Sequence, residues 1–366
     1  MPPVARKRPH SRRSTRPARS SRNLPVRRNG QDPWASLTRD EFLDLRICDL
    51  GVRLEGTWIE ECIDALYQEL DERGLSLRPH CWLSSEWFSP EGVPGIGIPF
   101  YLAHPRLMRL ERTMMLEVEG GTRTECMRIL RHETGHALQH AFDLHRRKRW
   151  RELFGPSTTP YPESYRPNPA SRKYVQHLRL YYAQSHPDED FAETFAVWMG
   201  PRSAWQRRYQ GWGALQKLHY VDELMEELRG GRPRRRSREV VEPLSSLTMT
   251  LREYYEGKRA QYTVSYPTTY DRELLKVFSN EPKHARRELA SRFIQRHRAE
   301  IRRTVARWTG EYEFTLDQLL RDMIGRCREL KLRVAGGQRQ VLLDFAGMLA
   351  VRTVHFLYSR RVSIAM

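Results

Sequence analysis

The sequence lacks several features that define whole classes of protein. Its five cysteines are odd in number and scattered, and none forms a Cys-x-x-Cys pair. We therefore expect neither a disulfide framework nor a cysteine zinc ribbon, and a reducing compartment is favoured. No segment approaches the about eighteen uninterrupted apolar residues of a membrane span, because the longest candidate, Val341 to Val351, contains Asp344. No secretory apolar run follows the basic start. These absences predict a soluble, cytoplasmic protein with no membrane span.

Acidic residues are missing from residues 1–31, which contain ten Lys and Arg residues of a chain with a net charge of +18. Arginine, serine and proline cannot bury enough apolar surface to offset the entropy of ordering, so this segment is predicted to be a disordered basic arm. A second acid-free run, residues 229–238, contains six arginines and predicts a linker. Both runs could make nonspecific contact with nucleic acid, or both could be solvated segments without a partner.

The residues that are present can build a folded core. Of 366 residues, 39% are hydrophobic and 10% are aromatic, which excludes wholesale disorder. Residues 80–104 place alternating small and apolar residues around a Ser89-Pro90-Glu91-Gly92 turn and predict a short antiparallel sheet. Apolar residues at helical spacing predict helices over 58–70, 124–149, 171–182, 189–199, a segment ending near 228, 271–280, 285–308, 315–332 and 338–358.

These elements predict four parts: a disordered basic arm over 1–31, a mixed domain over 32–228, an Arg-rich linker over 229–239 and a mostly helical accessory domain over 240–366. The mixed domain combines a small sheet with a long helix and further helices toward its C-terminal end. The predicted fold class is therefore α+β, followed by a second domain that is mostly helical.

The most informative string is His132-Glu133-Thr134-Gly135-His136, which lies in the strongest helical pattern of the chain. Residues four apart on a helix lie on one face, so both imidazoles can reach a single zinc ion. Glu133 then projects beside the metal, where it can take a proton from water. The alternative is an ordinary helix whose two histidines pack or lie at the surface. The string predicts a hydrolytic site with one zinc ion.

Zinc hydrolases usually have a third protein ligand and keep one position for water. His140 is the nearest candidate, but two helical turns, about 11 Å, separate it from His132, so both cannot bind one ion. We expect His140 at the surface or behind the ligands. Glu152 would point away from the site, and Glu163 lies in a Pro-rich loop over 155–170 and is a weaker candidate.

A later acidic segment is the better source of the third ligand. In residues 186–196, Glu189 and Glu193 share a helix face because they are four apart. One carboxylate could complete the metal site, and the other could orient a ligand imidazole through a hydrogen bond. Acidic residues also favour the first turn of any helix because of its dipole, which is the alternative explanation for this segment.

The string HETGH, followed at a distance by SHPDEDFAETFA, resembles the gluzincin metallopeptidases. It is similar to the bacterial family of putative zinc-binding metallopeptidases and, more remotely, to the lethal-factor-like peptidases. The resemblance implies a zincin-like fold in which His132 and His136 are zinc ligands and Glu133 is the general base. It further implies that Glu189 is the third ligand and that Glu193 holds a ligand imidazole.

The resemblance also implies a catalytic tyrosine seven residues before the ligand glutamate, a position that Tyr182 occupies. Its phenol could donate a hydrogen bond to a developing oxyanion, although Tyr181 is adjacent and Tyr182 could instead serve the core. The expected reaction is zinc-dependent hydrolysis of a protein or peptide substrate, with the strand over 96–102 aligning the peptide through its edge. The alternatives are a nucleic-acid-associated protein with an inactive zinc scaffold and a zinc amidase that acts on a non-protein amide.

Overall fold

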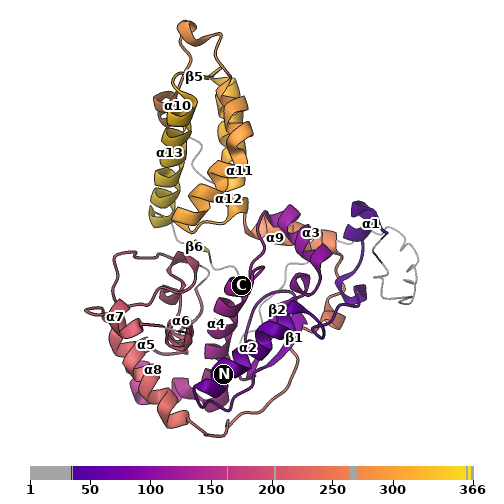
Figure 1. The fold of residues 1–366 in the computed structure, drawn as a ribbon, viewed down its shortest axis with the longest axis vertical. Helices are drawn as coiled ribbons and strands as arrows, with labels where there is room; N and C mark the ends of the chain where they lie inside the picture. Colours follow the sequence, from indigo (N-terminus) through magenta and orange to yellow (C-terminus); the bar gives the residue numbers. More distant parts are fainter. Residues whose placement is uncertain are drawn as a thin grey trace.

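A computed structural model describes residues 34, 36–162, 164–201, 203–263, 270–359 and 362–363. The predicted basic arm and Glu163 lie outside these residues. The first part of the chain forms a helical unit around a small sheet (Figure 1). Its elements are α1 (Arg39–Leu43), α2 (Trp58–Glu72), β1 (His80–Ser84), β2 (Gly95–Pro99), α3 (Pro105–Met115), α4 (Arg123–Phe142), α5 (Lys148–Phe154), β3 (Ser164–Tyr165), α6 (Pro187–Met199), α7 (Trp205–Arg208), α8 (Ala214–Leu228) and α9 (Leu251–Gln261), with 3-10 turns at Ile47–Asp49, Phe100–Ala103, Leu144–Arg146, Arg179–Gln184 and Leu244–Ser246.

This unit has one continuous hydrophobic core, to which α2, α3, α4, α6, α8 and α9 all contribute buried side chains. α4 runs through the middle of the unit and packs against α6 on one side and against α2 and β2 on the other. The combination of a small sheet with a long central helix and further helices confirms the predicted α+β class.

The sheet is not the antiparallel one that the sequence predicts over 80–104. β1 and β2 run parallel, with His80 opposite Gly95. The predicted turn does reverse the chain, but only far enough to place Phe88 in an antiparallel bridge with Gly97 on the outer edge of β2. β2 therefore lies between β1 and Phe88, which takes up part of its outer edge; the expected alignment of a peptide along the strand over 96–102 stays a prediction.

α4 is shorter than the predicted helix over 124–149. It begins after Thr122, whose side chain accepts a hydrogen bond from the backbone N–H of Glu125, and it ends at Phe142. Asp143 follows in the left-handed conformation, with φ 53°, which stops the helix. The apolar pattern continues beyond this point because α5 is a separate helix that packs in the same core.

The predicted helix over 171–182 is wrong. This segment is irregular up to the 3-10 turn Arg179–Gln184, in which Leu180 and Tyr181 have φ values of 57° and 59°. Such values are uncommon for residues with a side chain, and they break the helical pattern. α6 begins at Pro187, a favoured first helical residue, and the side chain of His186 caps it.

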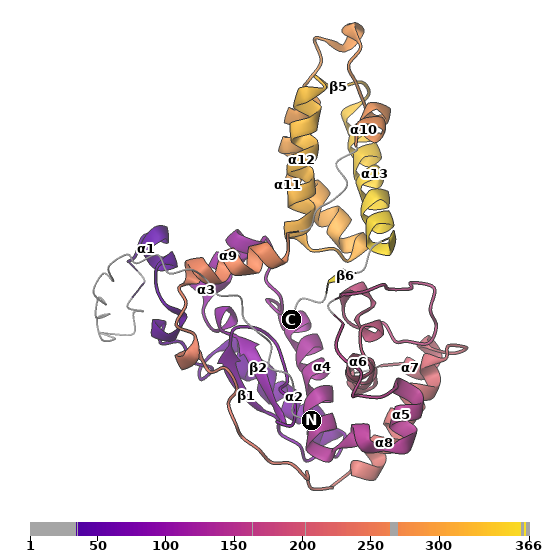
Figure 2. The same ribbon diagram turned by 180° about the vertical axis from the view of Figure 1, so that it is seen from behind.

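The last part of the chain forms a slender helical bundle that stands away from the first unit (Figures 1 and 2). Its helices lie near their predicted positions. The bundle has a hydrophobic core of its own, the second in the molecule, which consists of residues between Tyr270 and Leu349. Its elements are α10 (Asp271–Val277), β4 (Phe278–Ser279), the 3-10 turn Pro282–His284, α11 (Ala290–Thr309), α12 (Glu313–Glu329), β5 (Arg333–Val334) and α13 (Gln338–Ser359), and the chain returns to the first unit where β6 (Val362–Ser363) pairs with β3.

The division of the chain into domains stays a prediction, but several contacts bear on it. The predicted linker lies against the first unit, since the guanidinium of Arg235 pairs with Asp143 at 2.9 Å. Just beyond it, the indole of Trp82 donates to the carbonyl of Val241 at 2.8 Å. α9 follows the linker in sequence, yet its Tyr255 is fully buried in the first core. These contacts favour a boundary between α9 and α10.

α13 is long and apolar enough to cross a membrane by length and composition alone, over Gln338–Leu357. A third of this stretch is buried, and Phe345 and Leu349 pack in the second core. A core helix of a soluble bundle passes the same test of length and composition. The packing of α13 therefore agrees with a soluble protein, which stays a prediction.

Candidate metal centre

α4 presents its two motif histidines toward α6. Both imidazoles are buried and lie one turn apart on the face that α6 covers. Gly135, between them in the sequence, permits this close crossing, because a Cβ there would lie 2.8 Å from the Cα of Ala192. The small residues of the two helices thus bring the motif within reach of the carboxylates of α6.

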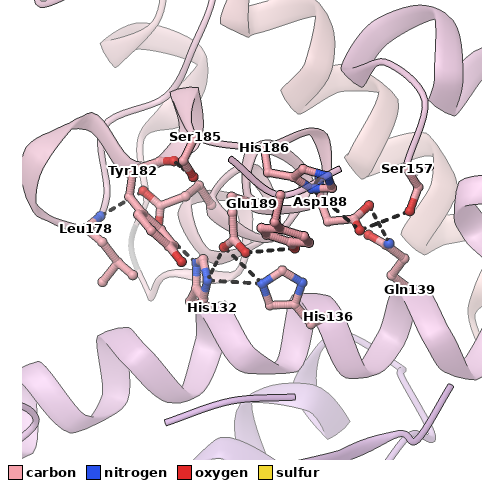
Figure 3. A network of polar contacts seen from close by, with 12 residues as sticks. His132, His136, Gln139, Ser157, Leu178, Tyr182, Ser185, His186, Asp188 and Glu189 are labelled. Atoms are coloured by element: carbon pink, nitrogen blue, oxygen red, sulfur yellow. Dashed lines mark hydrogen bonds and ion pairs between the residues drawn. The ribbon is translucent and has the colours of Figure 1, made fainter. Parts of the chain in front are cut away.

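Glu189 of α6 meets both imidazoles (Figure 3). Its Oε2 atom lies 3.0 Å from Nε2 of His132 and 3.1 Å from Nε2 of His136, and the two nitrogens are 3.2 Å apart. Ligand atoms of these three residues all lie within 4.8 Å of one another, the one such group among the described residues. Two imidazoles and a carboxylate form the donor set of a catalytic zinc site, so the residues present fit the ion.

Glu193, one turn further along α6, holds the first imidazole from behind. Its Oε1 atom lies 2.9 Å from Nδ1 of His132, and its Oε2 atom accepts the backbone N–H of Leu178 at 2.8 Å. This bond keeps the proton of His132 on Nδ1 and turns Nε2 toward the site. The predicted roles, with Glu189 as zinc ligand and Glu193 as the residue that orients His132, are compatible with these distances and stay a prediction.

The charges of the cluster favour a bound cation. Burial alone would lower the pKa of His132, but hydrogen bonds to Glu189 and Glu193 raise that pKa well above its usual range. Burial also acts to lower the pKa of His136, but the negative charge of Glu189 outweighs it and raises that pKa. Burial also raises the pKa of Glu133. A buried carboxylate that attracts protons onto both imidazoles offers the same attraction to a metal cation.

Residues 111–260 match a family model. The family is described as "Putative zinc-binding metallo-peptidase", and the matched residues include the HETGH string and both glutamates of α6. The match supports the resemblance to the putative zinc-binding metallopeptidases over these residues, called the matched segment below, which are less than half of the chain. No curated protein and no solved structure matches the chain. The family and the donor set together indicate zinc binding.

Tyr182, the predicted catalytic tyrosine, lies beside the cluster (Figure 3). Its ring centroid is 5.7 Å from that of His132. Burial raises the pKa of Tyr182 well above its usual range, so the phenol keeps its proton. The left-handed residues Leu180 and Tyr181 immediately precede it and direct the chain toward the site.

The matched segment also contains site residues that sequence reasoning missed. Tyr161, from the Pro-rich loop, donates its hydroxyl to Oε1 of Glu189 at 3.0 Å. Asp188, at the start of α6, accepts hydrogen bonds from Gln139 at 2.8 Å and from Ser157 at 2.9 Å. Neither the spacing nor the composition of the loop indicates these contacts.

Other acidic and histidine side chains of the segment do not join the cluster. His140 is buried at the end of α4 rather than at the surface, and burial together with nearby positive charge lowers its pKa to about 3. Asp190 pairs with Lys217 of α8. Glu152 is exposed on α5, where Lys148 lies 3.7 Å away, so its predicted orientation away from the site agrees with the structure.

Proposed function

We propose that the protein is a zinc-dependent peptidase that hydrolyses peptide bonds, with His132, His136 and Glu189 as the ligands of one zinc ion and Glu133 as the general base. The proposal rests on one observation above all. Glu133 is only 7% exposed, yet its carboxylate has no hydrogen-bond partner among the described residues. A structural zinc site has no use for such a carboxylate, whereas a hydrolytic site needs it to receive a proton.

Bound zinc would polarise a substrate carbonyl and make water easier to deprotonate. The protein's own residues account for the rest of the reaction. Glu133 accepts the proton of the attacking water, and its raised pKa brings it closer to neutrality, as proton transfer requires. It then returns the proton to the leaving amine. Tyr182, which keeps its proton, donates a hydrogen bond to the oxyanion.

We further propose a cytoplasmic location for the peptidase. All five cysteines are free thiols in the structure. Unpaired thiols are typical of a reducing compartment, in which a metal ion rather than disulfides stabilises a site.

Replacing Glu133 by Gln tests the assignment of the enzyme. We expect both wild type and Glu133→Gln to hold one zinc ion per chain, measured by elemental analysis after dialysis. Cleavage of an unbiased peptide library should fall by about 100-fold or more in the variant, because the amide cannot accept a proton. Glu152→Gln, which removes an exposed carboxylate from α5, should retain both properties.

The same experiment can contradict the proposal in two ways. Zinc in both proteins with cleavage by neither would favour a noncatalytic scaffold or a non-peptide amide as substrate. Equal cleavage by wild type and Glu133→Gln would show that another group accepts the proton.

A further inference from the structure

Tyr161 contacts the oxygen of Glu189 that faces away from the histidines. Oε2 of Glu189 is the atom close to both imidazoles, while Oε1 accepts the hydroxyl of Tyr161 at 3.0 Å. The two oxygens of one carboxylate therefore have separate partners.

The ring of Tyr161 is held in place by stacking. It lies parallel to the imidazole of His186, with centroids 3.7 Å apart and an interplanar angle of 14°. Nε2 of His186 lies 2.7 Å from the carbonyl oxygen of Thr159. Because a carbonyl oxygen can only accept, Nε2 must carry the proton and donate it. Nδ1 of His186 then accepts the backbone N–H of Asp188 at 3.1 Å. His186 thus joins the start of α6 to the loop that carries Tyr161.

Asp188 fixes the same loop from its other side. Its two carboxylate oxygens accept from Gln139 of α4 and from Ser157 of the loop (Figure 3). The loop is consequently tied both to the helix with the two histidines and to the helix with the glutamate. A side chain on this loop can hold an oxygen of Glu189 at a fixed distance from the cluster.

We propose that Tyr161 is a positioning residue that reserves Oε1 of Glu189, so that this glutamate binds zinc through Oε2 alone and a coordination position stays open for water. This inference rests on the proposed function. Carboxylates bind metal ions through one or two oxygens, and a catalytic site needs three protein ligands and an open position. A hydrogen bond to the second oxygen decides between the two modes.

Tyr161→Phe removes the hydroxyl and leaves the stacked ring. Since Tyr161 is 37% exposed, we expect the variant to fold. Without the hydroxyl, Glu189 is expected to bind through both oxygens. The readout is the visible spectrum of the cobalt-substituted protein, whose absorption weakens as the coordination number rises. We expect the absorption of Tyr161→Phe to fall at least about twofold, and its kcat on a cleaved library peptide to fall about 10-fold.

Tyr67→Phe is the matched control. Its hydroxyl donates to the carbonyl of Pro79 at 2.6 Å, remote in sequence from the cluster, and its cobalt spectrum and kcat should equal those of wild type. If wild type binds metal and cleaves peptide but the cobalt spectrum of Tyr161→Phe is unchanged, the inference about Tyr161 is overturned and the proposed function is not. Wild type that takes up neither cobalt nor zinc overturns the proposed function, and the inference with it.

Discussion

Glu193 is not one of the three candidate zinc ligands, yet its carboxylate connects one of these ligands to the surrounding backbone. It joins Nδ1 of His132 to the backbone of Leu178, which lies just before the turn that carries Tyr182. The orientation of a ligand and the position of a catalytic candidate thus depend on one carboxylate. Partners of this kind set the tautomer and the basicity of a ligand imidazole.

Glu193→Gln should lower zinc affinity about 10- to 100-fold, because the amide carries no charge and its nitrogen cannot accept the N–H of Leu178. Competition with a chromophoric chelator measures the affinity. Glu223→Gln, on the exposed face of α8, is the control and should bind zinc as wild type does. Equal affinity in Glu193→Gln would mean that His132 keeps its orientation without the carboxylate.

At this scale the sequence predicts the residues that belong to a motif and misses those that do not. The HETGH string and the two glutamates of α6 come together as expected, because helical spacing fixes which side chains share a face. Tyr161 and Asp188 escape prediction because their partners lie on other elements. The contacts of an irregular loop depend on the course of its backbone, and the spacing of apolar residues in the sequence does not predict that course.

The crossing of α4 and α6 creates the cluster, and Gly135 sets its distance. The Cβ that alanine would add is 2.8 Å from the Cα and 3.2 Å from the carbonyl oxygen of Ala192. Both are backbone atoms, so the helices must separate to accommodate it. Such a shift acts directly on the distance between the imidazoles and Glu189.

Gly135→Ala should therefore destabilise the fold by about 1–3 kcal/mol and weaken zinc binding, although alanine has the higher helix propensity. Denaturant unfolding measures the first effect and chelator competition the second. Gly325→Ala in α12, where an added Cβ meets nothing within 4 Å, should instead raise stability by about 0.5–1 kcal/mol. If both variants gained stability alike, close packing at Gly135 would not be the reason for its glycine.

The helices that the sequence predicts wrongly share a cause. The apolar pattern of α4 and α5 is continuous, but Asp143 adopts a left-handed conformation between them. The segment over 171–182 has a helical pattern because its apolar residues, such as Val175, enter the core from an irregular chain. Periodicity reports which residues are buried, and it predicts the backbone correctly only where one regular element buries them.

The whole molecule distributes its charge unevenly, and the structure shows that part of the excess is neutralised locally. In the Arg-rich run 229–238, Arg235 pairs with Asp143 and Arg229 pairs with Glu226 at 2.6 Å. The run lies against the first unit at both of these contacts. Residues 1–31 contain ten basic residues without any acidic one, so the arm is the larger source of uncompensated charge for a polyanion.

We propose that this arm supplies most of any nonspecific affinity for nucleic acid. Each cation that neutralises a phosphate releases counterions. The slope of log K against log salt concentration therefore becomes more negative by about 0.9 for each such cation. Deleting residues 1–31 should therefore weaken binding to a fluorescent DNA duplex at low salt and flatten this dependence, while zinc content stays unchanged. Replacing Arg234, Arg236 and Arg238 by Gln removes three cations from the other run and should have a smaller effect on the slope. Identical salt dependence with and without the arm would mean that its charges reach no phosphate, and the basic surface for any DNA contact would then have to lie on the folded units.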